Sequence, residues 1–221
     1  MSEAAPLVVG FDLDMTLIDT RPGFAACLTA LGEESGVVFD VEAMVANLGP
    51  PLDRLLRPYF PTLSNTQVWS LVERFRALYP DLAVAPTLAF PGAHDALASV
   101  RRHGGSTLVI TGKYAPNARL HTDALGFDVD HLVGEVWGHG KGPVLEQYGA
   151  SVYVGDHVHD VEGALAAGVQ SVSVLTGGCS EDALVDAGTH VVLPDLHSFP
   201  GWLDQHLVAT GLAAPAGDVR S

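Results

Sequence analysis

The sequence predicts an α/β fold, a doubly wound parallel sheet with an inserted small α-helical cap, and two features of the chain carry this prediction. Short continuous apolar runs rich in valine recur along the chain, as is typical of strands that are buried on both faces of a parallel sheet. Segments of helical length lie between most of these runs, and an alternation of strand and helix is the pattern of a doubly wound α/β domain.

Five apolar runs are expected to be strands of this sheet, and they cover residues 7–11, 107–110, 152–154, 172–175 and 191–193. The segments expected to be helices cover residues 93–103, 115–125, 142–148 and 161–167. The last of these segments is followed by Gly168, and glycine commonly ends a helix. The tail rich in alanine and glycine, residues 209–221, is expected to be loosely ordered.

Residues 21–85 break the alternation, because they contain no buried-strand run and are expected to form several helices in succession. The clearest of these helices begins near Ser64, where Gln67 completes the spacing of a capping box. Apolar residues then recur at helical spacing and form one stripe, which is typical of packing against a core. We therefore predict a core domain formed by residues 1–20 and 86–221 and a helical cap domain formed by residues 21–85.

The composition favours a folded, acidic protein. Hydrophobic residues make up 48% of the 221 residues and charged residues 17%, which allows a sizeable core and does not fit intrinsic disorder. Lys and Arg number 11 against 26 Asp and Glu, and the net charge of −15 repels nucleic acids and acidic membrane surfaces. We therefore expect no nucleic-acid or membrane partner, and any anionic ligand needs a local positive group.

The cysteines and the start of the chain indicate the compartment. The two cysteines, Cys27 and Cys179, are far apart and have neither a disulfide framework nor a zinc-ligand spacing. The short apolar run near the start of the chain has no basic segment before it and is soon followed by charge, so neither a signal peptide nor a membrane-spanning helix is expected. We expect a cytoplasmic protein, either a monomer or a homodimer.

Two acidic residues follow the first predicted strand. Asp12 and Asp14 stand at the carboxyl end of this strand, which is where open α/β sheets bind ligands. Repulsion between the two carboxylates would raise the proton affinity of one of them, so the pair suits one nucleophile and one acid/base group. A turn with two aspartates and Thr16 as a structural cap would explain the same pattern.

Three further features follow, and each suits a phosphate site. Thr111 and Gly112 end the next predicted strand and offer a hydroxyl and an unhindered backbone N–H to a phosphate oxygen. Lys141 stands just before a predicted helix and can neutralise both a carboxylate and a phosphoryl group. Asp156 and Asp160 follow another strand, and hard oxygen ligands of this kind suit Mg²⁺.

In this order the motifs resemble those of the haloacid dehalogenase (HAD) superfamily, and the match spans about residues 7–193. They are DLDMT, the threonine of ITGK, Lys141 and GDHVHD. The helical insert is similar to the small C1 cap of the phosphoglycolate phosphatase-like branch, and so is the FPGA sequence at residues 90–93. The resemblance implies a Rossmann-like HAD core and a Mg²⁺-dependent phosphatase that hydrolyses a small anionic phosphorylated metabolite, with a phosphoglycolate-like phosphomonoester as the first substrate to consider.

The resemblance also implies a role for each motif residue. Asp12 would attack phosphorus and form an aspartyl phosphate, and Asp14 would protonate the leaving alcohol and then activate water. Thr111 would hold the phosphoryl oxygens, while Lys141 would stabilise the developing charge. The metal ligands would be Asp12, the Asp14 backbone carbonyl, Asp156 and Asp160. These roles agree with phosphoryl transfer being largely positioning and charge neutralisation.

Four further residues are candidates for the substrate side of the site. Thr16 would orient Asp14 and is counted with the substrate-binding residues, and the Gly112 amide would bind the phosphate. Lys113 could bind the substrate phosphate or cap the following segment, and the two interpretations stay open. Arg54 in the predicted cap could clamp a substrate carboxylate or a second phosphate, or be an ordinary surface arginine.

Two positions depart from the superfamily pattern. Met15 stands where glycine is usual, so the turn after the nucleophile is made without the most permissive residue, and His157 replaces a small hydroxyl residue.

The presence of Asp14 disfavours a dehalogenase, and the absence of lysine from residues 21–85 disfavours the phosphonate-cleaving branch. A sugar-phosphate mutase, a pyrophosphatase or nucleotidase of the same superfamily, and a non-catalytic HAD-fold binding protein stay open as alternatives.

Overall fold

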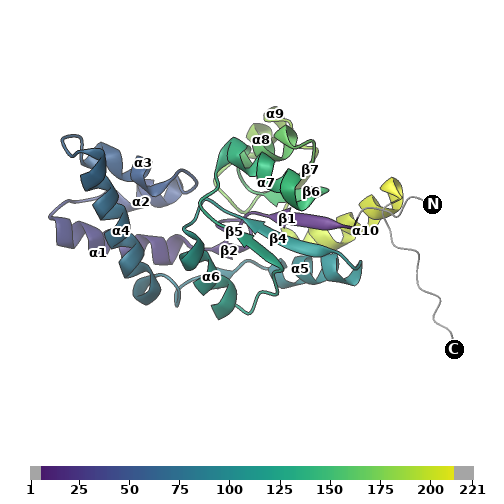
Figure 1. Ribbon diagram of the computed structural model, residues 1–221, viewed down its shortest axis with the longest axis horizontal. Coiled ribbons are helices and arrows are strands. Elements are labelled where there is room, and N and C mark those ends of the chain that lie inside the picture. Colours follow the sequence, from purple (N-terminus) through teal and green to yellow (C-terminus); the bar gives the residue numbers. More distant parts are fainter. Residues whose placement is uncertain (1–5, 212–221) are drawn as a thin grey trace.

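The computed structural model describes residues 6–211, and its centre is a six-stranded sheet with helices on both faces (Figure 1). The strand order is β5-β4-β1-β6-β7-β8, and every neighbouring pair runs parallel. β1 (Val8–Phe11) lies in the middle of the sheet between β4 (Ser106–Ile110) and β6 (Val152–Gly155). The predicted fold class, a doubly wound parallel α/β sheet, is confirmed.

The other strands of this sheet lie towards its edges. They are β5 (His131–Val133), β7 (Gln170–Val174) and β8 (Val191–Leu193). The sequence did not predict β5, because its residues begin with an exposed histidine and none of them is fully buried. It forms a strand at the edge of the sheet because β4 supplies its hydrogen-bond partners.

Helices cover both faces of the sheet, and the alternation of side chains along the strands separates two cores. Val9 of β1 belongs to the first core and Val8 to the second. The first face carries α5 (Ala93–Arg102), α6 (Ala115–Ala124) and α10 (Phe199–Thr210), and the second carries α7 (Lys141–Tyr148) and α8 (Val158–Ala166). The remaining short elements are α9 (Glu181–Asp186) and the 3₁₀ helices η1 (Arg57–Tyr59), η2 (Gly138–Gly140) and η3 (Leu196–Ser198).

Four helices lie between two short strands that pair antiparallel, β2 (Ile18–Asp19) and β3 (Leu88–Ala89). They are α1 (Arg21–Ser35), α2 (Val41–Ala46), α3 (Leu52–Leu56) and α4 (Asn65–Leu82). We call residues 21–82 the helical insert; it stands to the left of the sheet in Figure 1 and has a hydrophobic cluster of its own. The division into core and cap domains at the expected boundaries stays a prediction.

α4 begins where the sequence predicts. The Ser64 hydroxyl accepts a hydrogen bond from Gln67 N at 3.3 Å, and the Gln67 side chain accepts one from Ser64 N at 2.9 Å. These two bonds complete the expected capping box.

The end of the chain differs in part from the expectation. The expectation of a loosely ordered tail is wrong for Ala209 and Thr210. Both belong to α10, whose buried residues pack against the sheet. Positions 212–221 of the expected tail lie outside the described residues. Within residues 6–211, no helix combines the length and the apolar character needed to cross a membrane.

A buried contact between α4 and α6 joins the helical insert to the sheet. His121 Nε2 lies 3.1 Å from the Tyr79 hydroxyl, the two rings meet edge to face, and both side chains are buried. Burial lowers the pKa of His121 to about 4; the charge of Lys113 contributes to this shift, and Asp14 opposes it. The folded protein therefore holds a neutral imidazole at this position at neutral pH.

We predict that this histidine makes the fold sensitive to acid. The unfolded chain binds a proton at this imidazole near pH 6.5 and the folded protein only near pH 4, so acid favours the unfolded state. The free energy of unfolding should therefore fall as the pH drops from about 6.5 to about 4, by at most roughly 3 kcal/mol. Urea unfolding of the wild type and of His121→Gln at neutral pH and at about pH 5 measures this effect. An equal loss of stability in both proteins would contradict the assignment.

Candidate active site

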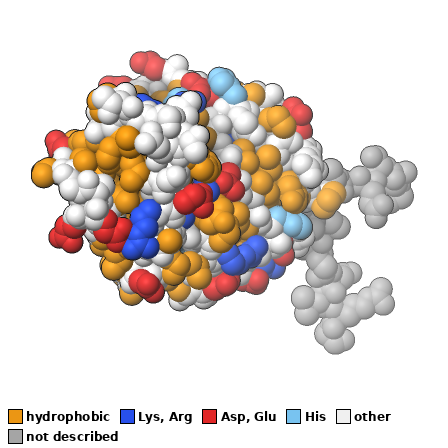
Figure 2. Space-filling model, turned by 60° about the vertical axis from the view of Figure 1, so that its left-hand side comes forward, with side chains coloured by type: hydrophobic (Ala, Val, Ile, Leu, Met, Phe, Trp, Pro, Cys, Tyr) orange, Lys and Arg blue, Asp and Glu red, His pale blue; other side chains and the backbone are white. Residues whose placement is uncertain are grey.

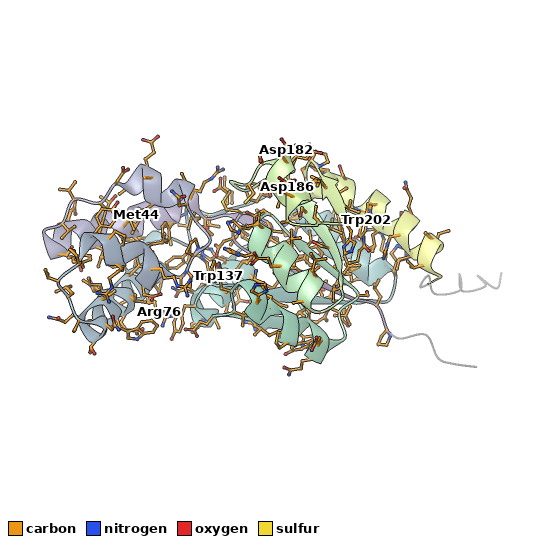
Figure 3. The ribbon with its side chains drawn as sticks, turned by 90° about the horizontal axis from the view of Figure 1, so that it is seen from above. Met44, Arg76, Trp137, Asp182, Asp186 and Trp202 are labelled. Carbon is orange, nitrogen blue, oxygen red and sulfur yellow. The ribbon has the colours of Figure 1, made fainter. Side chains whose placement is uncertain are left out.

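The carboxyl ends of β1, β4 and β6 border a cavity of about 390 Å³, whose other walls come largely from the helical insert. Asp12, Thr111 and Asp156 each follow one of these strands and line the cavity. Because the three strands are neighbours in the sheet, residues that are far apart in the sequence meet at one edge. Figure 3 shows two further lining residues, Trp137 and Arg76, at the boundary between the sheet and the insert.

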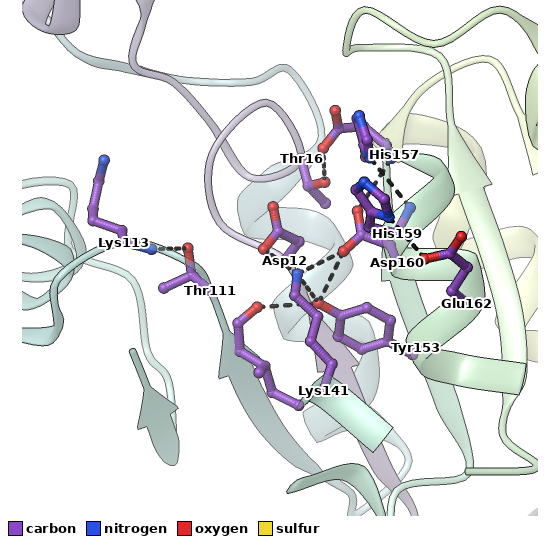
Figure 4. Close-up of polar contacts among 12 residues, drawn as sticks. Asp12, Thr16, Thr111, Lys113, Lys141, Tyr153, His157, His159, Asp160 and Glu162 are labelled. Carbon is purple, nitrogen blue, oxygen red and sulfur yellow. Dashed lines mark hydrogen bonds and ion pairs between the residues drawn. The ribbon is translucent and has the colours of Figure 1, made fainter. Parts of the chain in front are cut away.

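Lys141 is the centre of the polar contacts in this cavity (Figure 4). Its ammonium group donates to Asp12 Oδ1 at 2.7 Å, to Asp160 Oδ1 at 2.6 Å and to the Tyr153 hydroxyl at 2.8 Å. All four side chains are buried, and the Tyr153 hydroxyl in turn donates to the Ile110 carbonyl at 3.0 Å. Three acceptors therefore use the three protons of the ammonium group and fix its position.

The buried carboxylates around this lysine are short of positive charge. Burial raises the pKa of Asp12 to about 7; Lys141 opposes this shift, and the charges of Asp160 and Asp14 add to it. Burial also raises the pKa of Asp156 well above its ordinary value, with further contributions from Asp160 and Asp12. Burial alone would lower the pKa of Lys141, but the charges of Asp12 and Asp160 raise it well above its ordinary value. The lysine is therefore charged, while the acids lack a second cation.

The three carboxylates meet the requirements of a divalent metal ion. Oxygens of Asp12, Asp156 and Asp160 lie within 4.8 Å of one another, and all three residues are buried. Hard carboxylate oxygens in a site that lacks positive charge suit Mg²⁺. Both Asp160 oxygens already accept hydrogen bonds, one from Lys141 and one from His157 N at 3.1 Å. Asp12 and Asp156 are therefore better placed than Asp160 to bind the ion directly.

Thr16 differs from its expected role. Its hydroxyl donates to Asp156 Oδ1 at 2.7 Å rather than to Asp14, and its side chain is fully buried and outside the cavity lining. The reason is the tight turn after Asp12, in which Leu17 N donates to the Leu13 carbonyl at 2.9 Å. Thr16 therefore holds a carboxylate of the candidate metal site and does not face the cavity.

Asp14 forms a second ion pair in the cavity. Lys113 Nζ lies 2.8 Å from Asp14 Oδ1, both residues line the cavity, and the Tyr79 ring lies 4.8 Å from the Lys113 ammonium. Burial opposes the charge of Lys113, but Asp14 and Tyr79 raise its pKa above the ordinary value. Lys113 thus lies where a substrate-binding residue was expected, although its charge is already paired with Asp14.

Of the remaining substrate-side candidates, Gly112 lies in the cavity and Arg54 does not. Gly112 lines the cavity beside Thr111, whose hydroxyl accepts a hydrogen bond from Lys113 N at 3.2 Å. The Arg54 guanidinium lies over the ring of Trp137, a cavity-lining residue, at 5.2 Å and borders a neighbouring depression that shares Asp53 and Trp69 with the cavity. Arg54 therefore lies beside the candidate active site and not in the lining of its cavity.

Met15, which stands where glycine was expected, adopts a left-handed conformation with a φ of 64°. Two hydrogen bonds hold this turn: Met15 N donates to the Ile18 carbonyl at 2.8 Å, and the Met15 carbonyl accepts from the Thr176 hydroxyl at 2.6 Å. Glycine adopts this conformation without strain, whereas a residue with a side chain does not. The turn is therefore strained, and the Met15 side chain lines the cavity.

Two residues of the site escaped the sequence analysis. Tyr153 stands between two valines of β6 and is typical of a core residue, although its hydroxyl contacts Lys141. The available signal was that a buried tyrosine needs a hydrogen-bond partner for its hydroxyl. Gly177 follows β7 in a Gly-Gly pair, and a Cβ atom at this position would overlap the Asp156 carboxylate. Glycine at residue 177 therefore leaves room for a candidate metal ligand.

We predict that Gly177→Ala weakens metal binding, because a methyl group would displace the Asp156 carboxylate. Mg²⁺ that binds only the folded protein raises Tm, and this rise should be lost or much smaller in the variant. Gly178→Ala is the matched control, since the nearest atom to its Cβ would be the Ala46 carbonyl oxygen at 3.4 Å. Thermal unfolding with and without Mg²⁺ makes the comparison. If the ion raises Tm equally in all three proteins, Asp156 does not bind it.

Comparison with known proteins agrees with this geometry. The family model of haloacid dehalogenase-like hydrolases matches residues 9–174. The chain is similar to the "Probable phosphatase IndB" of Dickeya dadantii, with 31% identity over 85% of this chain and 89% of the relative. It is also similar to a phosphoglycolate phosphatase of Xylella fastidiosa, with 31% identity over 90% of this chain and 94% of the relative. A solved structure described as a predicted phosphatase from Clostridium acetobutylicum has a TM-score of 0.77 at 20% identity, over 90% of this chain and 99% of that chain.

The three comparisons support different statements. At 20% identity the solved structure shows the fold alone, whereas the family match covers more than half of the chain and includes every residue from Asp12 to Asp160. Both sequence relatives are named as phosphatases. The chain therefore belongs to the haloacid dehalogenase-like hydrolases, among their phosphatases of the phosphoglycolate phosphatase-like branch.

Proposed function

We propose that this protein is a Mg²⁺-dependent phosphatase that hydrolyses a phosphomonoester through an aspartyl phosphate on Asp12. The observation that carries the proposal is the contact of Asp12 with Lys141 at 2.7 Å, in a cavity that Asp14, Asp156 and Asp160 also line. Phosphoglycolate, which appears in the names of several relatives, is the reference substrate for a first assay.

In the first half of the reaction, Asp12 is the nucleophile. Its Oδ1 atom accepts a hydrogen bond from Lys141, which orients the carboxylate so that one oxygen stays at the metal site and the other attacks phosphorus. A bond forms between this oxygen and phosphorus while the bond from phosphorus to the alcohol oxygen breaks. Asp14, which lines the same cavity, enters this step protonated and gives its proton to the departing alcohol, and it regains a proton in the second half of the reaction.

In the second half, a water molecule attacks the phosphorus of the aspartyl phosphate. Asp14 is now ionised and accepts a proton from this water, and the Lys113 ammonium at 2.8 Å stabilises the ionised form. The bond between Asp12 and phosphorus breaks, which restores the Asp12 carboxylate and releases inorganic phosphate. We therefore assign Lys113 to the acid/base residue rather than to the substrate phosphate.

The remaining residues neutralise and orient the phosphoryl group. The Lys141 ammonium contacts the nucleophile. Thr111 and Gly112 follow β4 and line the cavity, where they can donate hydrogen bonds to phosphoryl oxygens. Mg²⁺, held by Asp12, the Asp14 carbonyl and Asp156, would supply the positive charge that the carboxylates lack and polarise the phosphoryl group. Asp160 holds Lys141 in place and assists at the metal site.

We predict that release of phosphate from a panel of phosphorylated metabolites requires both Mg²⁺ and Asp12. Asp12→Asn removes the nucleophile but keeps the size of the side chain, so kcat/KM should fall by about 10³-fold or more. Asp186→Asn on α9, outside the cavity, is the matched control and should retain wild-type activity. Unchanged turnover in Asp12→Asn, or equal turnover in EDTA and in millimolar Mg²⁺, would overturn the proposal.

We predict that Tyr153→Phe slows turnover because it loosens Lys141. The variant keeps the ring but loses the hydroxyl that accepts from the ammonium group and donates to the Ile110 carbonyl. Loss of one hydrogen bond to a charged group corresponds to roughly tenfold or more in rate. Steady-state kinetics should show a lower kcat with little change in KM, because Tyr153 does not line the cavity. Tyr148→Phe on α7 is the control and should keep the wild-type kcat. If Tyr153→Phe lowers Tm but leaves kcat unchanged, Tyr153 does not position Lys141.

A further inference from the structure

The lining of the active-site cavity is largely aromatic and apolar where the helical insert and the loops after β4 and β5 form it. Its aromatic side chains are Phe24, Trp69, Phe75, Tyr79, Tyr114 and Trp137. The volume of about 390 Å³ lies within the range of pockets that enclose drug-sized ligands. A phosphate group with a two-carbon acid is smaller than such a ligand and has no apolar group to pack against this lining.

Trp69 shows that folding alone does not explain the aromatic lining. It lies on α4, lines the cavity and is 48% exposed, so it contributes little to the core of the insert. The Arg76 guanidinium lies 5.2 Å from the centre of the Trp69 ring and 4.0 Å from that of Tyr114, which holds the two rings near each other. An exposed tryptophan beside other aromatic side chains in a cavity is typical of a surface that binds an apolar ligand.

Each lysine and arginine among the described residues that line the cavity is already paired, and Arg54, whose guanidinium lies over the Trp137 ring, borders the neighbouring depression rather than the cavity. Among the described residues that line it, the lysines and arginines are Lys113, Lys141 and Arg76. Each lysine is already paired with carboxylates of the catalytic site. On the face that Figure 2 shows, where the insert comes forward, basic atoms form a few separate spots next to acidic atoms.

Arg76 is paired as well. Its guanidinium contacts Glu135 at 2.8 Å and Glu73 at 2.9 Å, and its side chain is largely buried. A substrate carboxylate would have to displace one of these glutamates, and the acidic residues that line the cavity would repel it. The glycolate carboxylate of phosphoglycolate therefore finds no unpaired lysine or arginine among the described residues that line the cavity.

Met15 adds an apolar side chain beside the catalytic aspartates. Its backbone is strained at a φ of 64°, and its side chain lines the cavity and is 6% exposed. Glycine would make the same turn without strain. The side chain that this strained turn carries thus extends the apolar lining towards the phosphate end of the site.

We infer that the alcohol part of the substrate carries an uncharged aromatic group, and that the enzyme disfavours phosphomonoesters with a second anionic group. This inference rests on the proposed phosphatase function and specifies its substrate class. The phosphoryl group lies at Asp12 and Lys141, and the aromatic group packs against the side chains that the insert contributes, Trp69 among them.

Three substrates that differ in a single group test this inference. Benzyl phosphate, ethyl phosphate and 2-phosphoglycolate carry a phenyl, a methyl or a carboxylate group on the same CH₂–O–phosphate unit. The kcat/KM of benzyl phosphate should exceed that of ethyl phosphate by about tenfold or more, because the phenyl group is buried against aromatic side chains. 2-Phosphoglycolate should be the poorest of the three. If it is hydrolysed as well as benzyl phosphate or better, the substrate class is wrong while the phosphatase function stands.

Variants of the insert identify the residue that contacts the aromatic group. Trp69→Ala should lower kcat/KM for benzyl phosphate by about tenfold and leave ethyl phosphate nearly unchanged. Val38→Ala, at another exposed apolar residue of the insert and outside the cavity, is the control and should change neither value. Equal losses for both substrates in Trp69→Ala would show that Trp69 does not contact the aromatic group.

Binding of phosphonates separates a wrong ligand class from a wrong reaction. 2-Phenylethylphosphonate, propylphosphonate and 3-phosphonopropionate replace the ester oxygen of the three substrates by carbon, so they bind without turnover. Calorimetry in Mg²⁺ should give the phenyl compound a Kd about tenfold below that of the propyl compound. If this order holds while no ester is hydrolysed, the proposed reaction fails and the ligand class stands. If none of the three binds, or the phenyl group brings no advantage, the inference is overturned.

Discussion

The buried lysine ammonium at the end of the central strands is the interaction on which the rest of the site depends. The Lys141 ammonium group donates hydrogen bonds to Asp12 at 2.7 Å and to Asp160 at 2.6 Å, and it donates a third to the Tyr153 hydroxyl. A buried charge without a partner is strongly destabilising, so the lysine and the acids each require the other. A Cβ atom at Gly10 would lie 2.7 Å from the Tyr153 ring, and the absence of that atom lets the tyrosine pack across β1 and reach the lysine. Gly10 of β1 therefore helps to place the tyrosine that contacts Lys141.

The helical insert meets the site through a small set of side chains on α4. Tyr79 contacts both His121 on α6 and Lys113, the partner of Asp14. Arg76 pairs with Glu135, which follows β5, and thereby ties the insert to the sheet near the same cavity. The edge of the sheet thus carries the reacting charges, and the insert carries most of the apolar wall. Such a division lets the substrate range change through the insert while the chemistry stays the same.

Residue patterns in the sequence alone predicted the central strands, the start of α4 and part of the candidate active site. Valine-rich runs predicted the central strands of the parallel sheet, because strands that are buried on both faces must be apolar. Ser64 and Gln67 predicted the first turn of α4, because a capping box involves only residues close in the sequence. Asp12 and Asp156 could be placed at one edge of the sheet in advance, since parallel strands bring their carboxyl ends to the same edge, and the resemblance to the superfamily added Lys141. The family followed from the order of these motifs.

Only the tertiary structure decided which partner each charged or polar group has. Thr16 bonds to Asp156, 140 positions away, and not to its neighbour Asp14, because the turn after β1 directs it towards the end of β6. Arg54 lies over the Trp137 ring beside the cavity and not in its lining, although its place in the insert made it a candidate for binding substrate. The edge strand β5 likewise exists because β4 offers it hydrogen-bond partners. These contacts depend on how separate elements pack against one another, and the spacing of residues along the chain does not determine that packing.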